Sequence, residues 1–342
     1  MAKQLNLVLY VLYRVAKLRR GREFLSLLNH KIGINLSLSR KITKIWKVIV
    51  FPVEWVTRKL AQKRLNQVNV DTFSLCDDIG WAVTSCDQLP WGRETLKICQ
   101  NLVDSHIQHQ ATHDCDPSFV NAVTKSFRID LLTRADLLSQ QDLLRFATSP
   151  ELVLPISHYL RTIPVIGHYE LWLSYPNSTL ESSQCWHFDH EDKRQVKLFC
   201  LINDVWPENG PTNFLSLNAS RKLRASISNP YSRIIDSEVE SLIGVLQEQS
   251  HQVTGQAGAI TLLDTVRCAH MGARVRQGKR IMLMIQYVPF HCVLESNCHV
   301  LVDINSSNLT GGGWPEYVPH LLIDNPDKNI LWRAKPGQNL IH

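Results

Sequence analysis

The chain has 342 residues, of which 44% are apolar, and a formal net charge of +6. This is long enough for one large or two ordinary domains with buried cores, so we expect a globular protein. Its nine cysteines are odd in number and never spaced C-x-x-C, which argues against a disulfide framework or a cysteine-type zinc site. The cysteine pattern therefore indicates a reducing compartment, and we expect a cytoplasmic location.

The basic residues are concentrated at the start of the chain. Residues 1–64 carry 15 Lys and Arg against Glu23 and Glu54, a balance of +13, so the remainder carries −7. Ile42, Ile45 and Ile49 recur at helical spacing with lysines between them, which predicts a basic amphipathic segment. Two interpretations remain open: peripheral contact with an anionic membrane, or a helical layer packed on the main domain with solvated lysines.

Neither a membrane span nor a secretory signal is expected near the start of the chain. The longest apolar stretch there covers residues 5–13. This is well short of the roughly 20 apolar residues that a membrane-spanning helix needs. No small-residue cleavage site follows it. The chain also shows no nucleotide-binding motif or Ser/His/Asp hydrolase motif, and we expect no nucleic-acid partner.

Residues 65–149 are predicted to be a helical region that packs on the core. Helical apolar periodicity covers residues 94–107 and 134–148. A further helix is expected to follow, because Ser149 is a good N-cap residue and Pro150 suits a first helical turn. Helices should therefore dominate this part of the chain.

From about residue 164 the pattern changes to short runs rich in β-branched and aromatic residues. Turn signals such as Asn209-Gly210-Pro211 separate these runs. Several short strands of this kind are typical of a jelly roll or a related barrel, whose open mouth can hold a ligand. The predicted strands cover residues 165–174, 195–204, 212–217, 259–265 and 280–288.

A metal site is predicted at the start of this region. His187 and Asp189 are two residues apart, so in a strand both side chains project to the same face and can share one metal ion. Redox iron in oxygenases is typically held by two imidazoles and one carboxylate, so a third ligand is required. His270 follows a predicted strand, where a barrel could return it to the first pair. Arg280 could grip a carboxylate through two parallel hydrogen bonds.

Two stretches around these residues resemble the phytanoyl-CoA dioxygenase family. They read WHFDHEDKRQVKLFCLINDVWPENGPTNFL and AITLLDTVRCAHMGARVRQGKRIMLMIQY, and the resemblance extends over about residues 150–290. It implies an α+β fold with a double-stranded β-helix (jelly-roll, cupin-like) core flanked by amino-terminal helices. The domains would then be residues 1–64, a basic amphipathic segment; 65–149, the helical region; 150–295, the oxygenase core; and 296–342, a carboxy-terminal extension.

The resemblance also implies a function. Fe(II) would be held by His187, Asp189 and His270, and Arg280 would bind the cosubstrate 2-oxoglutarate, with Arg274 and Arg276 as alternatives for that role. Molecular oxygen would then hydroxylate an organic small molecule. The carboxylate of Asp189 argues against halogenation, since halogenating relatives carry a small residue there. The loop that reads SLNAS departs from the Gly-Ser-His turn of many members, so substrate contacts there stay open.

Two other functions remain as alternatives. One is a cupin-like metalloenzyme that uses the same three ligands without 2-oxoglutarate. The other is a barrel without catalytic activity that associates with a membrane through its basic start. The sequence identifies neither the substrate nor the oligomeric state.

Several further residues carry weaker signals. Asp264 and Gln184 could orient the histidines, or they could be ordinary polar residues at strand ends. Lys197 and Phe199 share one face of a predicted strand, which either looks into the pocket or is an ordinary barrel position. We set aside a second H-x-D pair, His190 and Asp192, because it falls after the strand. We interpret a helical row of histidines as a solvated face, and these are His106, His109 and His113.

Overall fold

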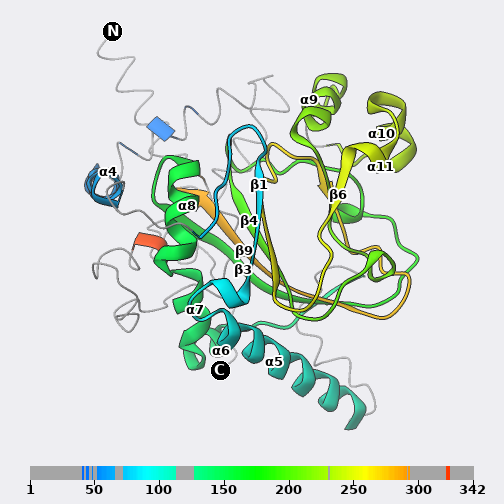
Figure 1. The fold of residues 1–342 in the computed structure, drawn as a ribbon, viewed down its shortest axis with the longest axis horizontal. Helices are drawn as coiled ribbons and strands as arrows, with labels where there is room; N and C mark the ends of the chain where they lie inside the picture. The colour runs from blue at the N-terminus through cyan, green and yellow to red at the C-terminus, as the bar shows by residue number, and fades with distance from the viewer. Residues whose placement is uncertain are drawn as a thin grey trace, which may run out of the picture.

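The computed structural model describes residues 41, 44, 45, 48, 52–65, 72–112, 127–229, 232–290, 292 and 321–323. Most of the basic segment, nearly all of the carboxy-terminal extension and His113 lie outside the described residues, as does the side chain of His109. Figure 1 shows helices α5 to α8 on one side of a central sheet and α9 to α11 beside strand β6 on the other. Within the described residues, no helix combines the length and apolar character needed to cross a membrane.

Helices dominate the described residues before β3, as predicted, and the predicted strands correspond to β3, β4, β5, β7 and β9. The helices are α4 Pro52–Leu65, α5 Gly92–Thr112, α6 Arg134–Ser139, α7 Gln141–Ala147, α8 Pro150–Leu160, α9 Leu217–Ser226, α10 Asp236–Ile243 and α11 Leu246–Gln249. The strands are β1 Trp81–Ser85, β2 Ile129–Asp130, β3 Pro164–Ser174, β4 Val196–Leu201, β5 Asn213–Leu215, β6 Ser250–Gln252, β7 Ala259–Leu263, β8 His270–Met271 and β9 Arg280–Pro289.

A local cap marks the start of one of the three helices that directly precede β3. The helical pattern over residues 134–148 forms two helices, α6 and α7, that meet at Gln140. Helix α6 starts with a capping box in which Thr133 and Asp136 satisfy each other's backbone amides. Helix α8 starts after Ser149 as expected, but the Ser149 hydroxyl donates to the carbonyl of Phe146 and does not cap the helix.

The strands form two antiparallel sheets. The larger has the order β1-β7-β4-β9-β3-β2 and the smaller β6-β5-β8. From β3 onward the chain passes repeatedly from one sheet to the other: β3, then a bridge from His187 to β8, then β4, β5, β7, β8 and β9. This alternation defines a double-stranded β-helix and confirms the predicted fold class. The sequence analysis missed β1 and β2, which lie in the stretch expected to be helical yet belong to the larger sheet.

The larger sheet is buried on both faces. In β9 the side chains of Ile281, Leu283 and Ile285 belong to the main core with the helices, whereas Met282 and Met284 pack in a second cluster on the opposite face. A strand covered on both faces reads as a continuous apolar run, which is what residues 280–288 show. The other face therefore looks into the space between the two sheets, where the predicted site lies.

Candidate metal centre

His187 and His270 lie directly opposite each other across an antiparallel bridge. The backbone amide of His187 donates to the carbonyl of His270 at 3.0 Å, and that of His270 donates back at 2.9 Å. Side chains of directly paired residues stand on the same face, and the two ring centroids are 4.2 Å apart. The fold thus brings together two imidazoles that are far apart in the sequence.

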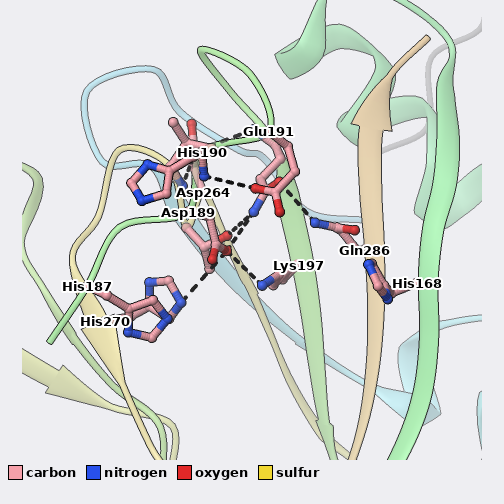
Figure 2. Close-up of polar contacts among 12 residues, drawn as sticks. His168, His187, Asp189, His190, Glu191, Lys197, Asp264, His270 and Gln286 are labelled. Atoms are coloured by element: carbon pink, nitrogen blue, oxygen red, sulfur yellow. Dashed lines mark hydrogen bonds and ion pairs between the residues drawn. The ribbon is translucent and has the colours of Figure 1, made fainter. Parts of the chain in front are cut away.

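Asp189 completes a group of three possible metal ligands. One ligand atom from each of His187, Asp189 and His270 lies within 4.8 Å of the other two. Figure 2 shows the two rings side by side and the Asp189 carboxylate facing them. Both histidines are buried. Two imidazoles and one carboxylate are the donor set of a mononuclear non-haem iron site, so the residues present fit such a metal.

Backbone carbonyls set the orientation of the imidazoles. The Nδ1 atom of His187 lies 2.8 Å from the carbonyl of Cys185, and that of His270 lies 3.3 Å from the carbonyl of Cys268. A carbonyl only accepts, so each Nδ1 donates and each Nε2 keeps its lone pair for a metal. Burial lowers the pKa of His187 well below its usual range and that of His270 to about 4. Both rings are therefore neutral near pH 7, as metal ligation requires.

Of the two alternatives for Gln184 and Asp264, the structure favours ordinary polar residues, because neither side chain hydrogen-bonds an imidazole. The Gln184 amide donates to Asn177 and to the carbonyl of Ala273, away from both rings. Asp264 accepts a hydrogen bond from the Tyr159 hydroxyl at 2.6 Å and others from backbone amides of its own turn. Both residues shape loops around the site without touching the imidazoles.

The Asp189 carboxylate is held by two donors, Lys197 on β4 and Gln195, which directly precedes β4. Lys197 Nζ lies 2.7 Å from Asp189 Oδ2, and the Gln195 amide donates to the same oxygen at 2.6 Å. Within the described chain no hydrogen bond reaches Oδ1. Burial raises the pKa of Asp189, but the positive charge of Lys197 more than offsets this, and the pKa lies below its ordinary value. The carboxylate is therefore ionised and positioned for a cation.

A chain of amides fixes Gln195 in turn. Gln286 on β9 donates to the side-chain carbonyl of Gln195 at 3.0 Å, and Gln195 also donates to the Thr265 hydroxyl at 2.6 Å. Lys197 and Gln286 are direct neighbours in the register of β4 and β9. Of the two alternatives for Lys197, the structure favours the one that faces the site. Gln195 was not singled out, although it lies in the predicted strand two residues before Lys197, where both side chains share one face.

The inner face of the larger sheet is also charged further from the metal ligands. Glu170 on β3 accepts hydrogen bonds from the Trp172 indole at 2.8 Å and from His168 Nδ1 at 3.1 Å. Although burial raises the pKa of Glu170, His168 and Arg128 lower it, and the net value is about 2. The cup between the sheets is thus lined in part by ionised groups, which suits a polar ligand.

Arg280 lies inside the same cup. It is 2% exposed, its Nη1 donates to the carbonyl of Gly210 at 3.0 Å, and its Nε has no hydrogen-bond partner. A Cβ atom on Gly272 would come within 3.0 Å of Nη1, and Gly272 lies two residues beyond His270. Burial lowers the pKa of Arg280 to about 9, with a smaller effect from Arg128. The site thus holds a buried guanidinium with no carboxylate partner among the described residues.

The two alternative arginines are placed differently. Arg274 pairs with Asp236 at 2.5 Å and donates to the carbonyl of Gln184. Arg276 is exposed. Of the three candidates, Arg280 alone combines deep burial with a donor atom that has no hydrogen-bond partner. Gly210, whose carbonyl accepts from Arg280, has a φ of +67°, and a Cβ atom added to it would lie 2.4 Å from the backbone of Arg274. No other residue would fit at this position.

The remaining sequence candidates are separate from this centre. Asp192, from the second H-x-D pair, lines a different cavity beside α4 and α8. His106 lies on α5, which packs against the helical core and not between the sheets. Phe199 shares the strand face of Lys197 and packs with Met284 in the cluster between the sheets.

Comparisons with known proteins give only distant likenesses. No protein-family model matches the chain, and no curated protein does. AviO1 from Streptomyces viridochromogenes Tue57 is 15% identical with a TM-score of 0.42, over 68% of this chain and 94% of that one. EctD from S. alaskensis, solved with 2-oxoglutarate and 5-hydroxyectoine, is 16% identical with a TM-score of 0.42, over 64% and 75%.

The epimerase SnoN, solved with Fe3+, alpha ketoglutarate and nogalamycin RO, is 14% identical with a TM-score of 0.41, over 75% of this chain and 93% of that one. These values are too low to assign a family. The resemblance to phytanoyl-CoA dioxygenases therefore stays a prediction from the sequence.

Proposed function

We propose that the protein is an Fe(II)- and 2-oxoglutarate-dependent dioxygenase that hydroxylates an organic small molecule. The observation that carries this proposal is the convergence of two neutral imidazoles and one ionised carboxylate within 4.8 Å inside a double-stranded β-helix. In the overall reaction, 2-oxoglutarate and O2 give succinate and CO2, and one oxygen atom enters a C–H bond of the substrate. Iron supplies this oxygen chemistry, while the protein binds and orients the reactants.

The residues around Gly272 support 2-oxoglutarate as the cosubstrate. A Cβ placed on Gly272 would lie 3.0 Å from Arg280 Nη1 and 3.2 Å from Thr212 Oγ1, so a guanidinium and a hydroxyl converge on the space left by the missing side chain. Both groups can bind a carboxylate, and the guanidinium can do so with two parallel hydrogen bonds. A dicarboxylate could then reach from Arg280 to the metal ligands along the inner face of β8.

Lys197 and Gln195 have a positioning role in this proposal. Both donate to Asp189 Oδ2, so they fix the carboxylate while Oδ1 remains available. Lys197 also adds a positive charge next to the metal position, which offsets the carboxylate charge in a buried site. Neither residue needs to contact the substrate for this purpose.

The first test measures cosubstrate binding. Anaerobic addition of 2-oxoglutarate to the Fe(II)-loaded protein should produce a charge-transfer absorption band. If iron binds and no band appears, the cupin-like alternative without 2-oxoglutarate is favoured. If iron itself does not bind, the barrel without catalytic activity is favoured.

The second test measures the ligand assignment. His187→Ala and Asp189→Ala should each abolish substrate-independent succinate formation. His158→Ala is the matched control, because His158 is exposed on α8, away from the space between the sheets. Retention of iron binding and turnover in both ligand variants would show that these residues do not hold the metal.

A further inference from the structure

A cavity lies outside the metal centre. It has a volume of about 770 Å³ and lies between α4, the carboxy-terminal end of α8, residues 192–194 and the end of β9. None of His187, Asp189 and His270 lines it. The proposed oxygenase chemistry gives this cavity no role.

The walls of the cavity are strongly basic. Asp192 is the one carboxylate among its lining residues, whereas the basic ones besides Arg58 are Lys41, Lys44, Lys59, Arg161, Lys193 and Arg194. Arg161 and Arg194 both pair with Asp77. The four lysines have no carboxylate partner within the described chain. Like charges gathered in a concave wall raise the local positive potential, so the cavity favours an anion with several negative oxygens.

A buried arginine fixes α4 as one wall of this cavity. Arg58 is 2% exposed and donates to the carbonyls of Ile163 and Pro164 at 3.2 Å each, and to that of Leu321 at 2.5 Å. Its guanidinium also lies over the Phe290 ring, 4.8 Å from the centroid. The helix is therefore tied to the start of β3 and the end of β9. Lys59 is held beside the cavity as a result.

The cavity also has an apolar part. Trp55, Leu160 and Phe290 line it together with the basic side chains. An inorganic anion would leave this apolar surface unused. A ligand that carries both an anionic group and an apolar portion would use both parts of the wall.

The solvent side of α4 extends this character beyond the cavity. Val53, Val56 and Leu60 are 78%, 46% and 55% exposed, and their spacing of three and four residues places them on one face. Lys59 and Lys63 flank this apolar face and are also exposed. Exposed apolar side chains bordered by lysines on a short helix are typical of a helix that lies in the headgroup region of a membrane.

We propose that the cavity and the exposed face of α4 form a binding site for an anionic phospholipid at a membrane surface. The phosphate headgroup lies among Lys44, Lys59 and Lys193, and Val53, Val56 and Leu60 enter the interfacial layer. This site would hold the protein at a membrane surface. It is independent of the proposed reaction, so either can fail without the other.

The test is co-sedimentation of the full-length protein with vesicles of phosphatidylcholine, either alone or containing phosphatidic acid. Wild-type protein should bind the second kind only. The double variant Lys59→Gln/Lys193→Gln should bind at least tenfold more weakly, because each basic residue near an anionic surface contributes about fivefold. Lys97→Gln/Lys222→Gln is the matched control, with the same charge change at exposed lysines on α5 and α9.

A second variant tests the apolar contribution. Val56→Gln/Leu60→Gln changes only exposed side chains, so it should fold normally and lose vesicle binding. Equal binding to both kinds of vesicle would overturn the proposal. The proposal would also be overturned if Lys59→Gln/Lys193→Gln bound vesicles as strongly as the wild type does, because the contact would then lie elsewhere in the basic segment. If Val56→Gln/Leu60→Gln binds vesicles unchanged and inorganic phosphate displaces the protein from them, the membrane proposal is refuted, and a soluble phosphate compound is the favoured ligand.

Discussion

Replacing Lys197 with Met should destabilise the metal-free protein far more than the metal-loaded protein. The change removes the ammonium but keeps an unbranched apolar stem. Lys197 Nζ lies 2.7 Å from Asp189 Oδ2, and the two side chains are 16% and 12% exposed. Without the lysine, the Asp189 carboxylate stays buried with Gln195 as its remaining side-chain donor.

The size of the effect follows from Coulomb's law and desolvation. At an effective dielectric constant of about 20, unit charges at this separation attract each other by about 6 kcal/mol. Desolvation of the ammonium offsets about half of this, which leaves a loss of roughly 3 kcal/mol, at the lower end of the range for breaking a buried ion pair. A bound divalent cation neutralises Asp189 directly, so the loss should then fall to about 1 kcal/mol.

Thermal unfolding with and without metal measures this difference. In the metal-free state the melting temperature should fall by roughly 4 to 6 °C, and in the presence of Fe(II) or Mn(II) by only about 1 to 2 °C. Lys222→Met, at an exposed position on α9, controls for the loss of a lysine. An equal decrease in both states, or no decrease without metal, would refute the reasoning that Lys197 compensates the charge of a metal ligand.

Three other variants test separate parts of the account. Arg280→Gln should raise the KM for 2-oxoglutarate by roughly 30-fold or more, because it removes the buried guanidinium of the proposed ion pair. Arg276→Gln, at an exposed position, is the control. An unchanged KM in Arg280→Gln would show that another group binds the cosubstrate. Gly272→Val should weaken 2-oxoglutarate binding without removing the metal, since its side chain would fill the space beside Arg280 Nη1; unimpaired cosubstrate binding would contradict this placement. Burial raises the pKa of Asp264 to about 6 from an ordinary value of 3.8, so the folded state binds this proton more tightly than the unfolded state does. The contribution of Asp264 to stability should therefore be largest below pH 4 and decrease as the pH rises to about 6. Asp264→Asn should flatten that decrease in urea titrations, and an unchanged pH profile would mean that Asp264 is not its source.

The fold class and the placement of His187 beside Asp189 could be predicted because each leaves a short-range trace in the sequence. The spacing of His187 and Asp189 places both on one strand face, and the continuous apolar run over residues 280–288 marks a strand buried on both sides. His270 needed the resemblance to a family, since only the bridge between residues 187 and 270 brings it to the site. No local pattern encodes a pairing over that distance.

The parts that were missed depend on tertiary contacts. Strand β1 is short and only partly buried, and it becomes a strand because it pairs with β7 from Trp81 to Ser85. The sequence left open what orients the histidines. The carbonyls of Cys185 and Cys268 accept from their Nδ1 atoms, and no pattern marks these carbonyls because every residue has one. The resemblance already favoured Arg280 over Arg274 and Arg276, and the structure adds a physical difference, because Arg280 is buried whereas Arg274 pairs with Asp236.

The most direct test of the central claim is an anomalous difference map from crystals grown anaerobically with Mn(II) and 2-oxoglutarate. One strong peak should lie within coordination distance of His187 Nε2, His270 Nε2 and the Asp189 carboxylate, with 2-oxoglutarate extending from it to Arg280. A peak at other residues, or no peak between the two sheets, would contradict the assignment of this group as the iron site.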